Sequence, residues 1–478
     1  MKQTTEVVFR TDNALLQRLM DAAEIKSKKN VRMFGERSVL VEGGGYEKIW
    51  LETQPMGGAM YAKRDLETGL NNQLMFMEYQ REDGRIPGSI AVIDGKVVPQ
   101  FNKFQGFCFP TPALDMYYLT GKSPAYLQQL YETLRKFDEY LWRVRDSDQD
   151  GCLESWCKYD TGEDRARRYQ DAPDPWDQET PPEGCQVVPM ASMDVMSFSY
   201  SARETMAEIA RLQGNTEQME RHLQDAGEIS ARMKDYLWDE SRGAFFDRDR
   251  FHNRMPALIH NTLRCMYWHS CSQEMADRFV KEHLLNPNEF WTKMPLPSVA
   301  VNDPIFVNEP ANDWSGQCEA LTYQRAIHAL EYYGYYELLP ILGQKLFEAI
   351  GPECHFVQQY DPFTMQPSGI GPEGDSGQDA YGPAMLSVME YCSRMYGVHI
   401  DREQLIWGTC TGANGSYEQK WNGHSYRIEN DGEKAAAYID NREVFLAKRG
   451  LRIQTDLVGT VISSATYEKD AENLVSQR

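Results

Sequence analysis

Helical segments that alternate with long loops are the sequence feature that most limits how this chain can fold. Between about residues 50 and 400, stretches with apolar residues three or four positions apart are followed by loops rich in Gly, Pro, Asp and Trp. The clearest helical stretches span residues 123–141, 193–212, 216–237, 319–333, 335–350 and 381–396. Because no strict repeat accompanies this rhythm, a solenoid is disfavoured, and we expect the helical hairpins to close into a toroid.

The periodicity changes from 3.6 to two residues after Gly397, and short strands are expected from about residue 406 onward. Alternating segments at 417–421, 425–428, 436–439 and 443–446 are separated by turn signals such as Asn422-Gly423. A strand at residues 6–10 and a helix at 13–25 are expected near the N-terminus. The sequence therefore predicts a mainly helical domain with an N-terminal lead-in over residues 1–405, and a small antiparallel β unit over residues 406–478.

The charge and the cysteines exclude several classes of partner. Asp and Glu number 71 against 50 for Lys and Arg, which gives a formal charge of −21. Nucleic acids and anionic membrane surfaces favour positive charge, so neither is expected as a partner. We find no run of roughly 18 apolar residues that could span a membrane and no apolar signal-peptide core near the N-terminus. Ten cysteines without C-x-x-C spacing are typical of a reducing cytoplasm, where we expect the protein to act.

The residue patterns favour sugar chemistry over other kinds of catalysis. The motifs G-x-S-x-G and H-E-x-x-H are missing and the nine histidines do not cluster, so we expect no catalytic metal and no cofactor. Aromatic residues make up 12% of the chain, and flat rings pack well on sugar faces as well as in any large core. Many loop carboxylates accompany them, and paired carboxylates cleave glycosidic bonds. A small carbohydrate is the expected partner; the oligomeric state is left open, with a homo-oligomer among the alternatives.

Four loops carry the residues that this chemistry needs. The first places Trp156 ahead of the run Asp160-Thr161-Gly162-Glu163-Asp164 and three arginines. Loops on a rigid scaffold often carry binding groups, although the preceding Asp146-x-Asp148-x-Asp150-Gly151 is also typical of a solvated acidic turn or a calcium loop. An EF-hand is excluded, because its twelfth position is Cys157 rather than a bidentate Glu.

The other three loops combine aromatic side chains with carboxylates or glycines. The second holds Trp50, Glu52, Gly57-Gly58, Arg64 and Asp65. The third holds Trp314 ahead of the helix that contains Glu319, and the fourth leads from Gln358 through the glycine-rich stretch 368–377 to Tyr381. Glycines allow a backbone to approach a ligand closely, but the second loop also fits a tight entry loop, and Asp313 or Ser315 in the third fits a helix cap.

Five segments resemble, in order, the motifs of glycoside hydrolase family 63 and the mannosylglycerate hydrolases. Residues 160–164 resemble the family's Glu/Asp-Ser-Gly-x-Asp motif. The others are Met193-Asp194-Val195, Trp238-Asp239-Glu240, the stretch from Pro297 to Gly316, and Phe356-x-x-x-Tyr360-Asp361-Pro362. The resemblance implies an (α/α)6 toroid of the six-hairpin glycosidase type, with its active site among the loops at one mouth and inverting hydrolysis of an α-linked sugar. It makes Asp164 the general acid.

The sequence departs from these motifs at functional positions. Ser315 and Gln317 replace the family's Arg and Pro in Trp-Arg-Gly-Pro, and Gln358 replaces the Glu that serves as catalytic base. An amide cannot take a proton from water, so either another carboxylate acts as the base or the chain is not a working hydrolase of this type. The candidate bases are Glu319, at the start of a rigid helix, and Glu373, Asp375 and Asp379 near the glycine-rich loop.

We expect a cytoplasmic, inverting glycoside hydrolase that acts on a small α-linked saccharide or glycoside. Three alternatives stay open: an (α/α)6 activity on uronic or unsaturated sugars, a non-catalytic sugar-binding homologue, and a sugar epimerase, which would need paired histidines. We expect Asp164 and Glu319 as acid and base. The residues expected around the sugar are Trp50, Glu52, Arg64, Asp65, Trp156, Asp194, Trp314, Gln358 and Tyr381.

Overall fold

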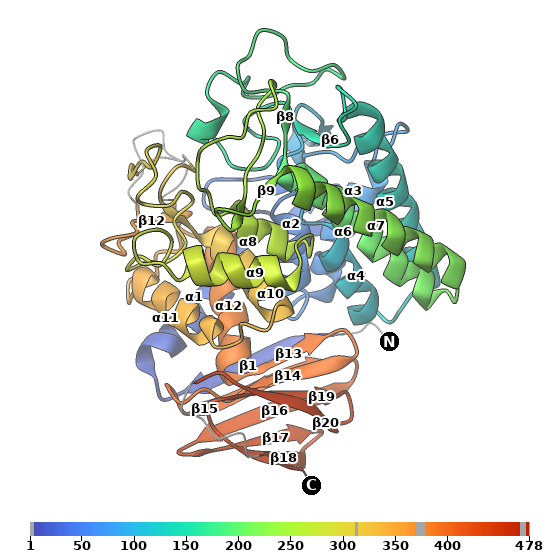
Figure 1. Ribbon diagram of the computed structural model, residues 1–478. Coiled ribbons are helices and arrows are strands. Elements are labelled where there is room, and N and C mark those ends of the chain that lie inside the picture. Colours follow the sequence, from blue (N-terminus) through green and yellow to red (C-terminus); the bar gives the residue numbers. More distant parts are fainter. Residues whose placement is uncertain (1–3, 311–313, 369–377, 469–474, 478) are drawn as a thin grey trace.

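The computed structural model describes residues 4–310, 314–368, 378–468 and 475–477. Within these residues, twelve α-helices fill the middle of the molecule, an antiparallel β region lies at one end, and long loops lie at the other end (Figure 1). None of the described helices is long and apolar enough to cross a membrane.

Six helices make a closed series of contacts in the middle of the molecule. They are α2 (Gln54–Tyr61), α4 (Pro110–Leu119), α6 (Met193–Leu212), α8 (Asn261–Tyr267), α10 (Ala320–Tyr332) and α12 (Gly382–Tyr396). Each contacts the next in this order, and α12 contacts α2. Helices enclosed by others can be apolar on most faces, and in α12 every residue is buried. We call these the inner helices.

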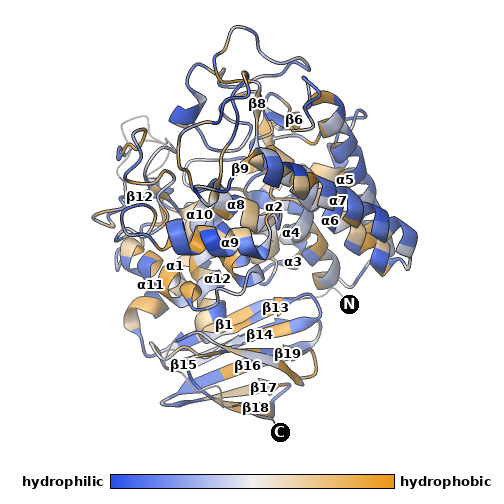
Figure 2. Ribbon diagram, viewed as in Figure 1, coloured by the Kyte–Doolittle hydropathy of each residue, from blue (hydrophilic) through white to orange (hydrophobic). Residues whose placement is uncertain are grey.

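The other six helices pack on the outside of the inner helices. They are α1 (Ala14–Lys29), α3 (Leu66–Glu78), α5 (Pro124–Val144), α7 (Thr216–Tyr236), α9 (Gln273–Phe279) and α11 (Leu338–Ile350). In α7 the buried residues are Ala226, Ile229 and Met233, three or four positions apart, and most of its other residues are hydrophilic (Figure 2), although Leu223 is exposed. The side chains of Ser123 and Asn215 cap α5 and α7 by accepting a backbone N–H. A short 3₁₀ turn (Arg167–Tyr169) and a π-helix (Val280–Leu284) complete the helical segments described.

The predicted helical stretches are confirmed, with small shifts at their ends: the stretch 335–350, for example, begins as a helix at Leu338. The prediction of a loop at Gly57-Gly58 is wrong, because both glycines lie inside α2. A Cβ on Gly58 would lie 2.6 Å from the Cβ of Asn72 in α3. These glycines therefore allow close packing of helices rather than close approach to a ligand.

The β region consists of two sheets in which all strands pair in antiparallel fashion. The strands of the larger sheet lie in the order β1 (Glu6–Thr11), β15 (Gly415–Trp421), β16 (His424–Asp431), β17 (Lys434–Ile439), β18 (Arg442–Lys448) and β21 (Val475–Gln477). Those of the smaller sheet lie in the order β13 (Val398–Asp401), β14 (Gln404–Gly408), β19 (Leu451–Asp456) and β20 (Val461–Thr466). β1 comes from the N-terminus and pairs with β15, with Glu6 opposite Lys420. The C-terminal run of strands begins at Val398, before the expected residue 406. The division into two domains stays a prediction.

Short strand pairs tie the remaining loops together. They are β2 (Val31–Phe34) with β3 (Arg37–Leu40), β4 (Ile49–Trp50) with β5 (Ser89–Ile93) and β6 (Lys96–Gln100), β7 (Glu154–Ser155) with β8 (Met190–Ala191), β9 (Trp238–Asp239) with β10 (Ala244–Phe245), and β11 (Cys318–Glu319) with β12 (Gln359–Tyr360). The pairing of β11 with β12 holds the segment before α10 beside a segment that leads to α12. Several of these pairs lie among the loops at the end opposite the β region (Figure 1).

Candidate active site

A small cavity lies where segments that precede the inner helices α2, α10 and α12 meet the loop between α5 and α6. It is lined by Glu42, Tyr46, Trp50, Glu52, Gln105, Gly162, Asp164, Trp314, Leu321, Gln358 and Tyr381. The cavity volume is about 50 Å³, so it admits water, and a sugar ring has to widen it. The structure thus brings together Asp164 and five residues expected around the sugar: Trp50, Glu52, Trp314, Gln358 and Tyr381.

Asp164 reaches the cavity from the loop between α5 and α6. The Nε2 atom of Gln105 donates to its Oδ1 at 3.1 Å, and the backbone N–H of Trp314 donates to its carbonyl oxygen at 3.2 Å. Two residues earlier, Gly162 has a φ of +80°, and a Cβ at this position would lie 2.2 Å from Cδ of Glu52. The loop therefore needs glycine at position 162 to bring Asp164 beside Glu52.

Asp160 fixes the start of the same loop. Its carboxylate accepts hydrogen bonds from the backbone N–H of Trp156 at 2.8 Å and of Phe104 at 3.1 Å, and it pairs with Arg145 at 2.6 Å. Burial raises the pKa of such a carboxyl, but Arg145 and the N–H donors outweigh it and hold the pKa of Asp160 below its usual value. Asp160 is therefore an ionised structural anchor for the loop.

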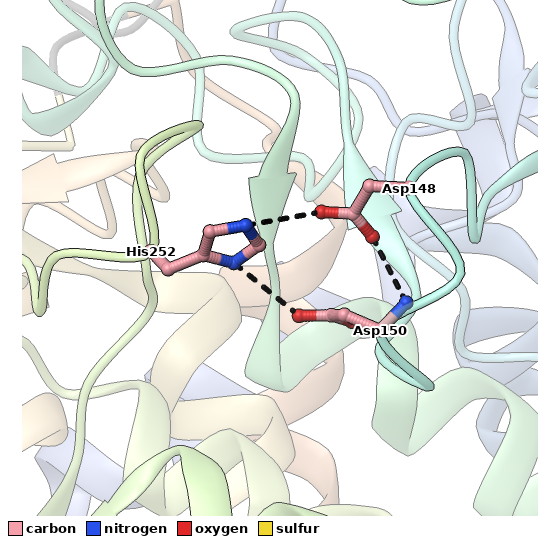
Figure 3. A group of neighbouring side chains, drawn as sticks. All are labelled: Asp148, Asp150 and His252. Atoms are coloured by element: carbon pink, nitrogen blue, oxygen red, sulfur yellow. Dashed lines mark hydrogen bonds and ion pairs between the residues drawn. The ribbon is translucent and has the colours of Figure 1, made fainter.

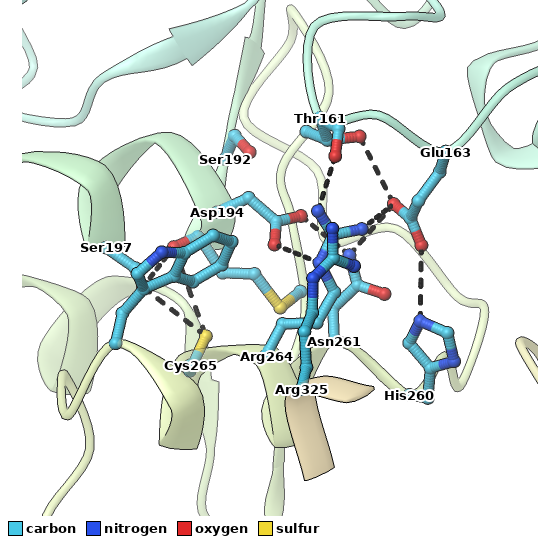
Figure 4. A network of polar contacts seen from close by, with 12 residues as sticks. Thr161, Glu163, Ser192, Asp194, Ser197, His260, Asn261, Arg264, Cys265 and Arg325 are labelled. Atoms are coloured by element: carbon cyan, nitrogen blue, oxygen red, sulfur yellow. Dashed lines mark hydrogen bonds and ion pairs between the residues drawn. The ribbon is translucent and has the colours of Figure 1, made fainter. Parts of the chain in front are cut away.

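A buried network of charges supports the loop from α6 and α8. Asn261 donates from Nδ2 to Oε2 of Glu163 at 2.9 Å and to Oδ2 of Asp194 at 2.6 Å (Figure 4). Arg264 places Nε 3.1 Å from Oδ1 of Asp194 and Nη1 3.4 Å from Oε2 of Glu163, which also pairs with Arg168. Burial raises the pKa of Asp194 to about 6, whereas the two arginines outweigh burial at Glu163 and lower its pKa. Asp194, expected beside the sugar, belongs to this network and does not line the cavity.

Glu52 connects the network to the cavity. Its carboxylate pairs with Arg325 of α10, and Nη2 of Arg264 lies 4.0 Å from its Oε1. Burial raises the pKa of Glu52 to about 7 and the charge of Asp164 adds to this effect, while the two arginines oppose it. The ionised form of Glu52 is therefore balanced by cations on α8 and α10.

A glycine-rich turn brings another carboxylate, Glu42, into the cavity. Three glycines follow Glu42, with φ values of +76°, +60° and +95°, and Tyr46 ends the turn. The hydroxyl of Tyr381 donates to Oε1 of Glu42 at 3.0 Å, and that of Tyr46 donates to Oε1 of Gln358 at 3.0 Å. Burial, followed by the charges of Glu52 and Asp164, raises the pKa of Glu42 well above its usual value. Carboxylates that share one buried cavity in this way suit proton transfer to and from a glycosidic bond.

Comparison with known proteins shows the family of the chain. The family model of the mannosylglycerate hydrolase MGH1-like glycoside hydrolase domain matches residues 51–380. The chain belongs to this glycoside hydrolase family. No curated protein matches its sequence.

Solved structures of several glycosidases share the fold of this glycoside hydrolase. A GH63 mannosylglycerate hydrolase from Thermus thermophilus, in complex with glucose, is 16% identical with a TM-score of 0.61, and the match covers 79% of this chain and 100% of that chain. A GH78 family rhamnosidase of Bacillus sp. GL1 is 13% identical with a TM-score of 0.58, covering 92% and 40%. A neutral trehalase from Saccharomyces cerevisiae is 13% identical with a TM-score of 0.53, covering 77% and 79%.

In this glycoside hydrolase, Trp156 supports the Asp164 loop from behind and does not line the cavity. Its Nε1 donates to Oε2 of Glu154 at 2.7 Å, and the guanidinium of Arg145 lies 4.2 Å from the centre of its ring. Because Trp156 is fully buried, it packs the base of the loop rather than forming a surface for sugar.

Arg64 and Asp65 follow the C-terminal end of α2, whereas Trp50 and Glu52 precede its N-terminal end. Eight helical residues separate the two groups by about 12 Å. Arg64 pairs with Glu24 at 2.9 Å, and Asp65 caps α3 by accepting the backbone N–H of Thr68 at 3.1 Å. The structure therefore does not bring these two residues to the cavity.

Replacing Asp65 by Ala tests this placement. We expect the free energy of unfolding to fall by about 1 kcal/mol, the usual contribution of a helix N-cap, while kcat and KM for a sugar substrate stay unchanged. Thermal unfolding and steady-state kinetics measure the two effects. Asn215→Ala, which removes the cap of α7, is the matched control; a raised KM in the Asp65 variant alone would place Asp65 in the sugar site.

The expected bases lie in different surroundings. Glu319 is buried beside the cavity lining, where Nε2 of Gln359 donates to its Oε1 at 2.6 Å across the β11–β12 pair. Asp379 pairs with Lys26 and accepts the backbone N–H of Phe356 at 3.1 Å. Glu373 and Asp375 lie outside the described residues. Glu319 as the base stays a prediction.

In the acidic turn at Asp146–Asp150, the carboxylates accept hydrogen bonds from backbone N–H groups of the turn itself. Asp148 and Asp150 accept the N–H groups of Asp150 and Cys152 at 3.1 and 2.7 Å. His252 lies 3.7 Å from Asp148 and 3.6 Å from Asp150 (Figure 3). The ligand atoms of these three side chains lie within 4.8 Å of one another, so they could hold a metal ion, but the hydrogen bonds already account for the arrangement. This geometry favours the interpretation as a structural turn.

Sequence reasoning missed four residues of the cavity: Glu42, Tyr46, Gln105 and Leu321. The run Glu42-Gly43-Gly44-Gly45-Tyr46 carried a usable signal, since consecutive glycines next to a carboxylate and an aromatic residue are typical of a tight turn at a functional position. Gln105 and Leu321 have no comparable signal, because one lies in an irregular loop and the other resembles any apolar residue of a helix.

Proposed function

We propose that the chain is an inverting glycoside hydrolase that cleaves a small α-linked saccharide or glycoside, with Asp164 as the general acid. The observation that carries this proposal is the convergence of Asp164, Glu42 and Glu52 on one small cavity in a chain of a glycoside hydrolase family. Buried carboxylates so close together cannot all ionise at low cost. Burial and mutual repulsion raise the pKa of Glu42 and that of Glu52, and Asp164 is assigned as the acid because it ends the run 160–164, which resembles the family's acid motif.

The two tryptophans of the cavity support a carbohydrate ligand. Trp314 is buried, and its ring packs edge-on against His260 at 5.9 Å. The Nζ atoms of Lys48 and Lys103 lie 5.0 and 5.1 Å from the ring of Trp50. The Nε1 atoms of both tryptophans are buried without a hydrogen-bond partner in the described part of the chain. Hydroxyl groups of a sugar can accept these bonds while the rings pack on its apolar face.

We also propose that the helices form an (α/α)6 toroid. The support is the closed order of contacts among the inner helices, from α2 through α12 and back to α2, with an outer helix packed on each. In such a toroid the segments before α2, α10 and α12 would meet at one mouth, which agrees with the composition of the cavity.

A cytoplasmic location belongs to the same proposal. All ten cysteines are free, a state that a reducing compartment maintains. A cytoplasmic enzyme would act on a short imported or internally made substrate rather than on a polymer.

A second candidate function is that of a sugar-binding homologue without hydrolytic activity. The observation that favours it is Gln358, which occupies the position of the catalytic base in the family 63 motif that this segment resembles. Its side chain accepts a hydrogen bond from Tyr46 at 3.0 Å. The two candidates differ in turnover, since both would bind a sugar in the same cavity.

A screen of nitrophenyl α-glycosides and natural disaccharides tests the proposal. We expect at least one to be hydrolysed, and anomeric NMR on the first minutes of reaction to show the β-anomer of the released sugar, because an inverting pair delivers water to the face opposite the leaving group. Release of the α-anomer first would contradict the inverting mechanism. Binding of a sugar by calorimetry, with no hydrolysis of any probe, would favour the binding homologue.

A further inference from the structure

We propose that Glu42 is the general base of this enzyme and that it activates the attacking water in place of a carboxylate at position 358. This inference rests on the proposed hydrolase function and names the residue that the function still needs. It is carried by the backbone that holds Glu42, by the two oxygens of its side chain, and by the state of the other carboxylates around the cavity.

The backbone holds Glu42 firmly against the start of α12. Its N–H donates to the carbonyl oxygen of Lys48 at 3.2 Å, and its own carbonyl oxygen accepts the N–H of Gly382 at 2.6 Å. The next residue, Gly43, forms an isolated bridge with Tyr381. A Cβ on Gly43 would lie 2.4 Å from the carbonyl oxygen of Ala380, so only glycine allows the turn to approach this closely. Glu42 therefore has the fixed position that a general base requires.

The two carboxylate oxygens of Glu42 differ in their surroundings. Oε1 accepts the hydrogen bond from the hydroxyl of Tyr381, which orients the carboxylate. Within the part of the chain that the structure describes, no group donates to Oε2, although Glu42 lines the cavity. One oxygen is thus held in place while the other can accept a proton from a water molecule in the cavity.

The turn that carries Glu42 also contacts the position where the family has its base. Tyr46, at the end of the turn, donates to Oε1 of Gln358, and its ring lies 6.4 Å from that of Tyr381. Glu42 and Gln358 are therefore held by two neighbouring tyrosines on the same part of the cavity wall. A carboxylate from the turn can serve the water that Gln358 cannot deprotonate.

The other described carboxylates are engaged in different ways. Glu52 pairs with Arg325, lies 4.0 Å from Arg264 and contacts Gly162. Glu319 accepts the amide of Gln359 and is not part of the cavity lining. With Asp164 as the acid, Glu42 is the lining carboxylate that no described cation pairs with directly.

The chemical step balances with these two residues. The water oxygen bonds to the anomeric carbon and gives a proton to Oε2 of Glu42, while the bond from the anomeric carbon to the leaving oxygen breaks and Asp164 gives its proton to that oxygen. The products are the free sugar of inverted configuration and the released alcohol. Glu42 ends protonated and Asp164 ionised, and exchange with solvent restores both.

The groups that face Glu42 also determine how the rate depends on pH. Burial, with Glu52 and Asp164 beside it, raises the pKa of Glu42, while the Tyr381 hydrogen bond and the charge of Arg325 lower it, and the net direction is upward. A base with a raised pKa loses its proton only at a higher pH. We therefore expect the rising limb of kcat/KM against pH to lie above the usual range of a glutamate, about 4.3.

Leaving-group dependence distinguishes a base from an acid. We would compare α-D-glucosyl and α-D-mannosyl fluoride, whose fluoride needs little protonation, with the O-glycosides cleaved in the screen. Glu42→Gln should lose about 10²–10⁴-fold in kcat on both kinds of substrate, the range of general-base catalysis, with unchanged KM and melting temperature. Asp164→Asn should lose activity chiefly on the O-glycosides. Glu47→Gln, an exposed residue five positions further along, is the matched control and should match the wild type.

Two further variants make the test decisive. In Glu42→Ala, added azide should restore turnover and give the β-glycosyl azide, because azide attacks without a base. Should Glu42→Gln unfold, Glu42→Asp keeps the carboxylate and should retain measurable hydrolysis at an unchanged KM. A raised KM with normal kcat in that variant would assign a binding role instead.

Glu42→Gln and Gln358→Glu separate the role of Glu42 from the hydrolase activity of the chain. If Asp164→Asn behaves as expected but Glu42→Gln hydrolyses every substrate within about threefold of the wild type, the hydrolase function stands and Glu42 is not the base. If the wild type cleaves no probe while Gln358→Glu does, the natural chain lacks a base, and both proposals fall together.

Discussion

Asp164→Asn should lower kcat for an O-linked disaccharide by about 10²–10⁴-fold, the contribution of general acid catalysis, while the melting temperature stays unchanged. The side chain is half-buried and accepts a hydrogen bond from Gln105 at its Oδ1, which an asparagine Oδ1 can also accept. The variant therefore keeps the contact and loses the proton that the leaving group needs. Steady-state kinetics and thermal unfolding measure the two effects.

A second aspartate on the same loop is the matched control. Asp160→Asn removes a buried charge that pairs with Arg145 at 2.6 Å and accepts two backbone N–H groups. It should lower the melting temperature clearly, since breaking a buried pair leaves Arg145 uncompensated. Near-normal turnover in Asp164→Asn, or an equal loss of stability in both variants, would remove the assignment of Asp164 as the acid.

The sequence predicted helices well where a helix has one buried face or a clear cap. The stretch 216–237 is such a case, because α7 buries one stripe of residues and begins after the capping Asn215. α2 was missed, because an eight-residue helix buried on most sides has no amphipathic pattern and contains two glycines. The pairing of β1 with β15 could not be predicted either, since local periodicity says nothing about partners about 400 residues apart.

Cavity residues were predicted where they directly precede an inner helix. Trp50 and Glu52 precede α2, Trp314 precedes α10 and Tyr381 precedes α12, so one rule placed them together. The same rule failed at Arg64 and Asp65, because the unrecognised helix α2 carries the chain away from the cavity before it reaches them. Glu42 was missed because its turn follows a short hairpin and meets the cavity through contacts with Gln358 and Tyr381, which lie more than 300 residues further along the chain.

Replacing Arg264 by Met should destabilise the fold by about 3–5 kcal/mol, as expected when one partner of a buried charge network is removed. Arg264 is almost fully buried, lies 3.1 Å from Asp194 and 3.4 Å from Glu163, and donates to the carbonyl oxygen of Thr161. Because Met fills a similar volume, the lost stability comes from the missing charge and hydrogen bonds rather than from a cavity. Urea unfolding measures it, and Arg211→Met, which removes the exposed partner of Glu208, should leave the midpoint almost unchanged.

The decrease in the free energy of unfolding caused by Arg264→Met should also depend on pH in a definite direction. Arg264 lowers the pKa of Glu52, Glu163 and Asp194, although burial already raises that of Glu52 to about 7 and that of Asp194 to about 6. Without the arginine, Glu52 and Asp194 hold their protons to a still higher pH than the carboxyls of the unfolded chain, which titrate at about 4, and the pKa of Glu163 is less strongly lowered. The folded state then binds more protons than the unfolded state, so its stability falls as pH rises through this range. Destabilisation should therefore be larger at about pH 8 than at about pH 5, whereas an equal loss at both values would mean that Arg264 acts through packing and not through its charge.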